Sequence, residues 1–125
     1  DGPIILGVTL LTSLDKKDLE GFGIKELVAN EVTSLAKMAK EEGLNGIICS
    51  AREIGSIRKS LGKDIIIVTP GIRPKDYIAD DQKRIMQAKE AIAAGADYLV
   101  VGRPITQEPD PLAAAARIIE EINNA

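Results

Sequence analysis

The chain has 125 residues, of which 45% are apolar and 28% are charged, and its net charge is −3. This length and composition predict one folded domain over residues 1–125 and argue against a disordered chain. The absence of a basic excess excludes a typical nucleic-acid-binding protein. With no histidine and one cysteine, a zinc site would lack its usual ligands, although carboxylates alone could still bind Mg²⁺.

The sequence shows no pattern typical of a membrane or secretory segment. No run approaches the roughly 20 apolar residues of a membrane span, and no basic-then-apolar leader is present. A single cysteine, Cys49, rules out an intramolecular disulfide and fits a reducing compartment, so we expect a cytoplasmic protein. The abrupt opening Asp1-Gly2-Pro3, without an initiator methionine, suggests a fragment, a processed chain or an engineered one.

The first predicted element is a strand over residues 4–9, where β-branched residues do not alternate with polar ones. Such a run is typical of a strand that is buried on both faces. Thr12, just beyond it, is placed either to face a ligand or to cap a turn. Asp15, Lys17 and Glu20 resemble a D-x-K-x-x-(D/E) pattern. Because they follow no strand, we interpret them as the charged start of a helix.

The second unit combines an amphipathic helix with a strand over residues 46–49. The helix is predicted to end at Gly43, and its apolar stripe is Ile24, Leu27, Val28, Val32, Leu35 and Ala39. We interpret Cys49 as a buried strand residue and not as a nucleophile, because the chain has no histidine to activate it. Ser50 and Glu53 have the spacing of a capping box, which predicts that another helix begins there.

The third predicted strand, residues 65–69, follows a helix that ends at Gly62. Arg73 stands between two prolines after this strand, so the following loop should begin stiffly. The polar segment 75–87 is long for such a loop and could act as a lid. Within it, Gln82 could donate an amide hydrogen bond to a phosphate, or it could simply belong to a solvated charged loop.

The fourth unit has a short helix over residues 88–94, stopped by Gly95, and a strand over residues 98–101. Gly102 follows and would let a ligand approach the backbone closely, because it has no Cβ atom. Arg103 offers a planar fork of donors that suits a phosphate, unless it is only a surface-turn arginine.

A last helix is predicted with Asp110 as its N-cap and Pro111 in its first turn. The chain thus contains four βα units, which predict an α/β fold with a parallel sheet and right-handed crossovers. A doubly wound sheet usually has five or six strands, whereas a (β/α)₈ barrel has eight units in about 250 residues. Four units in half that length favour half of a TIM-type barrel. A flavodoxin-like signalling domain would need a fifth strand and clustered acidic strand ends, and neither is visible.

Four segments, residues 8–13, 68–74, 81–86 and 95–105, occur in the order and with the spacing of a known enzyme family. Over essentially its whole length the chain resembles the C-terminal half of bacterial orotidine 5′-phosphate decarboxylase. The resemblance implies strands 5–8 of a homodimeric (β/α)₈ barrel. It also implies an enzyme that converts orotidine 5′-monophosphate to UMP and CO₂ in pyrimidine biosynthesis without a cofactor.

The same resemblance implies roles for five residues of this chain. Thr12 would lie at the pyrimidine end of the nucleotide. Arg73 and Gln82 would belong to the loop that closes over the phosphate, and Gly102 and Arg103 would grip that phosphate. Backbone donors, an amide and arginine forks all suit a phosphate dianion.

Two departures from the family pattern bear on activity and local structure. The family's catalytic lysine and aspartates, in a D-x-K-x-x-D motif on early strands, have no counterpart here. We therefore assign no catalytic residue and expect this chain alone to be inactive. Gln87 and Ala88 stand where the family usually has Thr-Pro. We expect this change to loosen the start of the following helix.

An alternative is a non-catalytic phosphate-binding half-barrel, natural or engineered. A half-barrel would expose apolar faces and strand edges that invite association. The expected partners are thus a nucleotide together with either a second copy of the chain or an N-terminal half.

Overall fold

The computed structural model describes residues 2–75, 77 and 84–125. Four strands run through this part of the chain: β1 (Leu6–Val8), β2 (Gly46–Ile48), β3 (Ile66–Thr69) and β4 (Tyr98–Leu99). They form one parallel sheet in the sequential order β1-β2-β3-β4. The predicted parallel sheet of four βα units is thereby confirmed.

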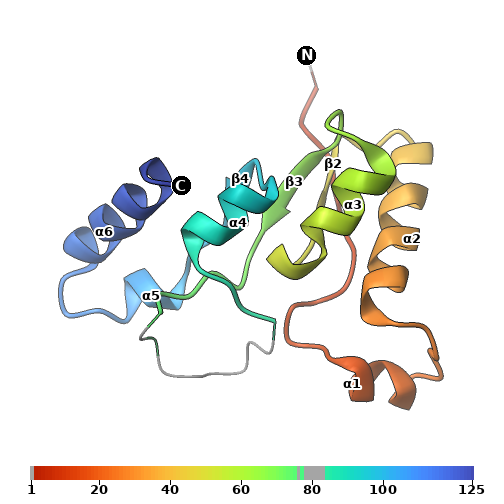
Figure 1. Cartoon of the computed structure of the whole chain (residues 1–125), viewed down its shortest axis with the longest axis horizontal. Helices are drawn as coiled ribbons and strands as arrows, with labels where there is room; N and C mark the ends of the chain where they lie inside the picture. Colours follow the sequence, from red (N-terminus) through yellow and green to blue (C-terminus); the bar gives the residue numbers. More distant parts are fainter. Residues whose placement is uncertain (1, 76, 78–83) are drawn as a thin grey trace.

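The helices decide between the two architectures that the sequence left open. They are α1 (Lys16–Gly21), α2 (Val28–Glu41), the 3₁₀ turn η1 (Ala51–Glu53), α3 (Ile54–Leu61), α4 (Ala88–Ala94), α5 (Arg103–Thr106) and α6 (Pro111–Asn123). In Figure 1, α2, α3 and α4 stand side by side in front of the strands, with α6 next to α4. Helices on one face of a sequentially ordered parallel sheet are the arrangement of a barrel, whereas a doubly wound sheet carries helices on both faces. The fold is therefore half of a (β/α)₈ barrel.

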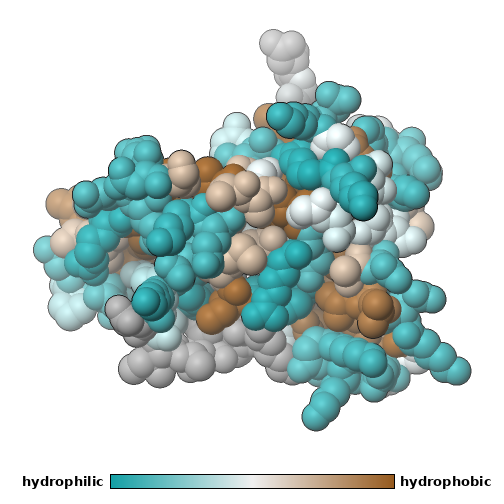
Figure 2. Space-filling view, in the orientation of Figure 1, coloured by the Kyte–Doolittle hydropathy of each residue, from teal (hydrophilic) through white to brown (hydrophobic). Residues whose placement is uncertain are grey.

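The hydrophobic core fills the space between the sheet and this helical layer. Ile47 and Ile67 point from the central strands toward the helices and are fully buried. Helical residues close the core from the other side: Val32, Ala36, Ile54, Ile57, Ala88, Ala91 and Ile118. With few aromatic residues, the core consists of interlocking aliphatic side chains. The helical side is mostly hydrophilic at its surface (Figure 2).

The opposite face of the sheet carries an apolar row, defined here as Val8, Ile48, Val68 and Tyr98. These residues are partners in register across all four strands. Because side chains alternate along a strand, they lie on the face away from Ile47 and Ile67. The two ends of the row are exposed, Val8 by 59% and Tyr98 by 61%. This face corresponds to the inside of a complete barrel.

The edge strands are shorter than the sequence predicts. β1 begins at Leu6 and not at Ile4, and β4 ends at Leu99 and not at Val101. Within the described residues each edge strand has one hydrogen-bonded neighbour, so half of its backbone groups have no strand there to pair with. The central strands, which have two neighbours, start and end within one residue of the predicted bounds.

Several predicted helix ends are confirmed, and two predicted helix starts are corrected. Gly62 and Gly95 adopt φ angles of 77° and 108°, where glycine is favoured, and they end α3 and α4. Asp110 caps α6 by accepting a hydrogen bond from the Ala113 N–H at 3.0 Å. However, Ile24 lies before α2, which begins only at Val28.

The second correction concerns the capping box predicted at Ser50 and Glu53. Ser50 does cap η1, but the Glu53 carboxylate is directed to Arg84 instead of the helix start. At α4, the Glu90 carboxylate accepts the Gln87 N–H at 3.0 Å, and this cap stands where Thr-Pro is usual in the family pattern. In the described part of the chain no helix has the length and apolarity needed to cross a membrane.

Candidate functional site

The loops that follow the four strands gather at one edge of the sheet, because parallel strands all end on the same side. This edge is at the bottom of Figure 1, where α1 and α5 lie. Thr12, Arg73 and Gly102 lie in three of these loops, and Arg103 directly follows Gly102 as the first residue of α5. The structure thus brings four of the five predicted binding residues to one edge, whereas Gln82 lies outside the described residues.

The first loop, which follows β1, is attached to the third loop through the backbone of Thr12. Thr12 is buried, and its carbonyl accepts the Arg84 N–H at 3.3 Å. The sequence left Thr12 open as a ligand contact or a turn residue. Its burial and its link to the third loop place it in a fixed position at the strand ends.

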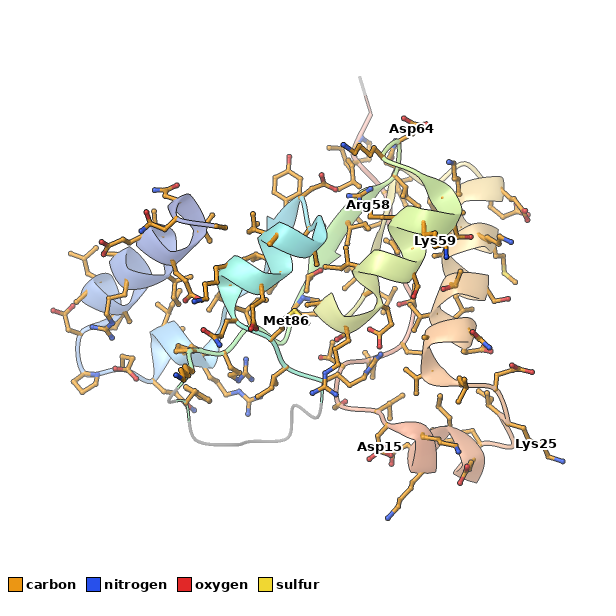
Figure 3. All side chains as sticks on the ribbon, viewed as in Figure 1. Asp15, Lys25, Arg58, Lys59, Asp64 and Met86 are labelled. Atoms are coloured by element: carbon orange, nitrogen blue, oxygen red, sulfur yellow. The ribbon has the colours of Figure 1, made fainter. Side chains whose placement is uncertain are left out.

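Arg73 is also buried and lies at the same strand-end edge. Its N–H donates to the Met86 carbonyl at 3.1 Å, and its Nη1 donates to the Ile72 carbonyl at 2.9 Å. Its guanidinium carbon lies 5.2 Å from the centre of the Tyr77 ring, a cation–π distance. Met86 lies below α4 at the strand-end edge (Figure 3). These contacts fasten both ends of the third loop to each other.

The fourth loop offers open space beside its backbone. A Cβ atom placed on Gly102 would meet no heavy atom of the described chain within 4 Å, and the residue is exposed. The Gly102 carbonyl accepts the N–H groups of Ile105 and Thr106 at 2.8 and 3.1 Å, which starts α5 with Arg103 as its first residue. A ligand could therefore reach this backbone directly, with the cationic Arg103 as the next residue. The Tyr77 hydroxyl donates to Gln107 Oε1 at 3.3 Å and so connects the third loop to the end of α5.

Sequence reasoning missed a buried ion pair behind these loops. Arg84 and Glu53 are only 5% and 4% exposed, and Arg84 Nη1 lies 3.0 Å from Glu53 Oε1. Arg84 Nη2 also donates to the carbonyls of Leu10 and Leu11 at 3.1 and 2.9 Å. The one available signal was the position of Arg84, which directly follows the Asp-Gln-Lys sequence of the third loop.

Two other candidates take the structural roles that were predicted for them. Asp15 is the N-cap of α1 (Figure 3), where its carboxylate accepts the N–H groups of Lys17 and Asp18 at 2.9 and 3.2 Å. Cys49 is fully buried, and burial raises the pKa of its thiol to about 12, so it is protonated at neutral pH. Among the residues that the structure describes, no group of three or more acidic or cysteine side chains could hold a metal ion.

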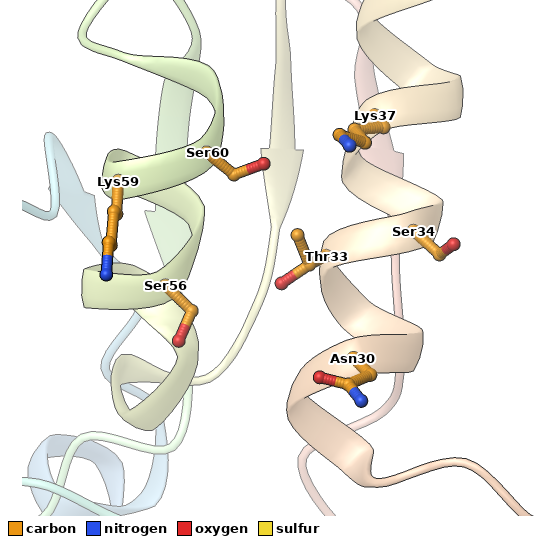
Figure 4. Close-up of a pocket in the computed structure, with 7 residues that line it drawn as sticks. All are labelled: Asn30, Thr33, Ser34, Lys37, Ser56, Lys59 and Ser60. Carbon is orange, nitrogen blue, oxygen red and sulfur yellow. The ribbon is translucent and has the colours of Figure 1, made fainter.

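The molecule also has a groove away from the strand ends. A groove of about 560 Å³ runs between α2 and α3 and is lined by Thr33, Lys37, Ser56, Lys59 and neighbouring polar residues (Figure 4). It is open to solvent on the outer helical layer and contains none of the predicted site residues. We base the site on the strand ends, because loops from separate units meet there.

Comparison with known proteins agrees with this geometry. The sequence profile described as the orotidine 5′-phosphate decarboxylase / HUMPS family matches residues 1–118. Orotidine 5′-phosphate decarboxylase of Citrifermentans bemidjiense is 49% identical over 120 residues, which are 96% of this chain and 50% of that protein. The decarboxylase of Syntrophotalea carbinolica is 51% identical and is covered to 49% of its length.

Solved structures give the same relationship. The crystal structure of orotidine 5′-phosphate decarboxylase from Lactobacillus acidophilus superimposes with a TM-score of 0.78 at 40% identity. The match covers 98% of this chain and 50% of that one. The chain therefore spans about half the length of the curated relatives that it matches. By its profile, its identity to these enzymes and its half-barrel fold, the chain belongs to the orotidine 5′-phosphate decarboxylase / HUMPS family.

Proposed function

We propose that this chain forms the phosphate-binding half of an orotidine 5′-phosphate decarboxylase barrel. In this proposal Gly102 and Arg103 bind the phosphate of orotidine 5′-monophosphate or UMP. Arg73 and Gln82 shape and close the third loop, and Thr12 contacts the pyrimidine end. The reaction needs no cofactor, and the protein acts in the cytoplasm.

The observation that carries this proposal is the open backbone at Gly102. Among the described residues no heavy atom lies within 4 Å of the position where a side chain would begin, and a cationic residue follows immediately. A phosphate dianion can accept hydrogen bonds from such backbone groups and from the fork of Arg103. The family relationship favours the phosphate of a nucleotide over other anions.

The apolar row supports the second part of the proposal, that residues 1–125 provide strands 5–8 and that an N-terminal half of the same family covers the row. Val8 and Tyr98 are exposed at the ends of the row, and β1 and β4 each have a free edge. Four further strands would pair with both edges and bury the row. The matched relatives have about twice the length of this chain. The remaining half of each relative is therefore long enough to supply four further strands.

Decarboxylation by the chain alone is not expected. Loss of CO₂ leaves a carbanion-like carbon that needs a positioned proton donor. The only residues resembling the family's catalytic motif, Asp15, Lys17 and Glu20, belong to α1 and its cap. Lys17 and Glu20 are exposed, and Asp15 is engaged in capping. We therefore place the proton donor on the N-terminal half.

The test is an activity assay with orotidine 5′-monophosphate, followed by its absorbance change. The pure chain should give no conversion. Co-production with the N-terminal half of the Citrifermentans bemidjiense enzyme should give conversion and a stable complex. Conversion by the pure chain would contradict the assignment of the catalytic groups. A stable complex without conversion would contradict the assignment of this chain as the phosphate-binding half.

The exposed row also favours an alternative, a non-catalytic phosphate-binding module that associates with a second copy of itself. Sedimentation equilibrium of the pure chain distinguishes the two. A dimer that becomes monomeric in the double variant Val8→Lys, Val100→Lys would support self-association through this face, since both residues are exposed on it. Ser56→Lys on the helical side adds charge outside the face and is the matched control. A monomer at all concentrations would exclude the alternative.

A further inference from the structure

Arg84 connects three loops of the strand-end edge through one buried side chain. Its Nη2 donates to the carbonyls of Leu10 and Leu11 in the first loop, at 3.1 and 2.9 Å. Its Nη1 pairs with Glu53 of the second loop at 3.0 Å. Its own backbone belongs to the end of the third loop. A planar guanidinium can reach these partners at the same time because its donors point in different directions.

The backbone of Arg84 adds two further connections. Its N–H donates to the Thr12 carbonyl at 3.3 Å, and its carbonyl accepts the Ser50 hydroxyl at 3.1 Å. Two residues later, the Met86 carbonyl accepts the Arg73 N–H. Arg84 thus lies between the segment that carries Thr12 and the segment that carries Arg73, and it contacts or adjoins both.

Burying this ion pair is energetically unfavourable, which indicates that the two side chains do more than fill space in the core. Glu53 Oε2 and Arg84 Nε are buried and have no hydrogen-bond partner among the described residues. Arg84 Nη1 is close to Glu53 without the alignment of a hydrogen bond. Apolar residues of similar size often stabilise a fold as well as a buried ion pair does. What they cannot do is fix the carbonyls of residues 10 and 11 in direction and distance.

We infer that Arg84, held by Glu53, is a positioning residue that sets the spacing between the pyrimidine end and the phosphate end of the nucleotide site. This inference rests on the proposed function, in which Thr12 serves one end and the third and fourth loops serve the other. A ligand that spans both ends depends on this spacing. Inorganic phosphate occupies one end only and depends on it far less.

The prediction follows from that difference. In Arg84→Met, the affinity for UMP should fall about tenfold or more, since misplaced binding groups lose roughly the energy of a charged hydrogen bond. The affinity for inorganic phosphate should fall by much less. A merely destabilised protein would lose both affinities in proportion to its unfolded fraction, so the ratio of the two affinities separates positioning from stability.

Arg58→Met is the matched control. Arg58 is another largely buried arginine that donates to several backbone carbonyls and pairs with a carboxylate, Asp97 at 2.7 Å. It lies at the edge of the sheet opposite the site. This variant should lose stability and keep the ratio of the UMP and phosphate affinities. Arg84→Lys keeps the charge beside Glu53 and serves if Arg84→Met does not fold, because one ammonium group cannot replace the fork.

The experiment is isothermal titration calorimetry of the full chain and each variant with UMP and with inorganic phosphate. A selective loss of UMP affinity in the Arg84 variants, absent in Arg58→Met, is the expected result. An unchanged ratio in folded Arg84→Met or Arg84→Lys would overturn the inference and leave the proposed function intact. Failure of the unmodified chain to bind either ligand would remove the proposed function, and this inference with it.

Discussion

Arg58 and Asp97 join helix α3 to the start of strand β4, with Arg58 Nη2 2.7 Å from Asp97 Oδ2. The same carboxylate oxygen accepts the Ile67 N–H at 2.7 Å, which brings the neighbouring strand into the contact. Arg58 further donates to the carbonyls of Gly62, Ile65 and Gly95. One side chain therefore connects α3 to the start of β3, the end of α4 and the start of β4, at the sheet edge opposite the candidate site.

Arg58→Met should lower the free energy of unfolding by about 2–3 kcal/mol, because several charge-assisted hydrogen bonds are lost in a largely buried position. Urea denaturation followed by circular dichroism measures this change. Lys59→Met on the same helix is the control: its side chain is exposed, so a change within about 0.5 kcal/mol is expected. Equal effects of the two substitutions would contradict the role given to Arg58 (both are labelled in Figure 3).

Gly46→Ala should disrupt the sheet. A Cβ atom on Gly46 would lie 2.5 Å from the Ile66 carbonyl oxygen and 2.7 Å from Leu6 Cδ2, and the carbonyl belongs to the backbone of the adjacent strand. Because β2 lies between two strands, it cannot move aside, and we expect a loss near the upper end of the usual overpacking cost, about 3 kcal/mol.

Gly55→Ala provides the comparison for this substitution. Gly55 lies within α3, where a Cβ atom would meet none of the described residues within 4 Å. Alanine is favoured over glycine in a helix, so this variant should gain up to about 1 kcal/mol. Thermal unfolding of both variants tests the pair, and a Gly46→Ala protein as stable as the parent chain would refute the packing argument.

Cys49 should make stability depend on pH in the alkaline range. Burial raises the pKa of the thiol from 9.0 to about 12. The unfolded chain therefore releases this proton near pH 9, whereas the folded chain keeps it. The contribution is fully present below pH 9 and is lost as pH rises toward 12, which amounts to about 2 kcal/mol at pH 10.5.

Denaturation of the parent chain and of Cys49→Ala at pH 8 and pH 10.5 measures this effect. The parent should lose more stability than the variant over this interval. The folded thiol should also react slowly with iodoacetamide and rapidly in urea. An identical pH dependence in both proteins would show that the thiol does not contribute.

Local sequence patterns were sufficient to predict much of the fold. The glycines that end α3 and α4 and the Asp110 cap are effects of a few neighbouring residues, and they lie where expected. The central strands were predictable because each is a continuous apolar run with partners on both sides. The ends of β1 and β4 were not predictable in this way, because each of these edge strands has a strand partner on one side only in the described part of the chain.

The contacts between Glu53, Arg84 and the first loop could not be predicted from local sequence patterns. Glu53 has the spacing of a capping residue, yet it pairs with an arginine in another unit. Arg84 donates to Leu11, a residue 73 positions away in the sequence. No local pattern indicates such contacts, because they arise only when the strand ends meet. Motif spacing predicted that Thr12, Arg73, Gly102 and Arg103 lie near the strand ends, because each directly follows or lies close to the end of a predicted strand, and the structure places them there.

The most direct test of the central claim is a nuclear magnetic resonance titration of the ¹⁵N-labelled chain with UMP. We expect saturable shifts of the Thr12, Arg73, Gly102 and Arg103 amides. We also expect an affinity reduced about tenfold or more in Gly102→Ala, whose added methyl group would occupy the ligand's space and lie more than 4 Å from the other described residues. Shifts confined to the groove between α2 and α3, or full affinity in a folded Gly102→Ala, would contradict that claim.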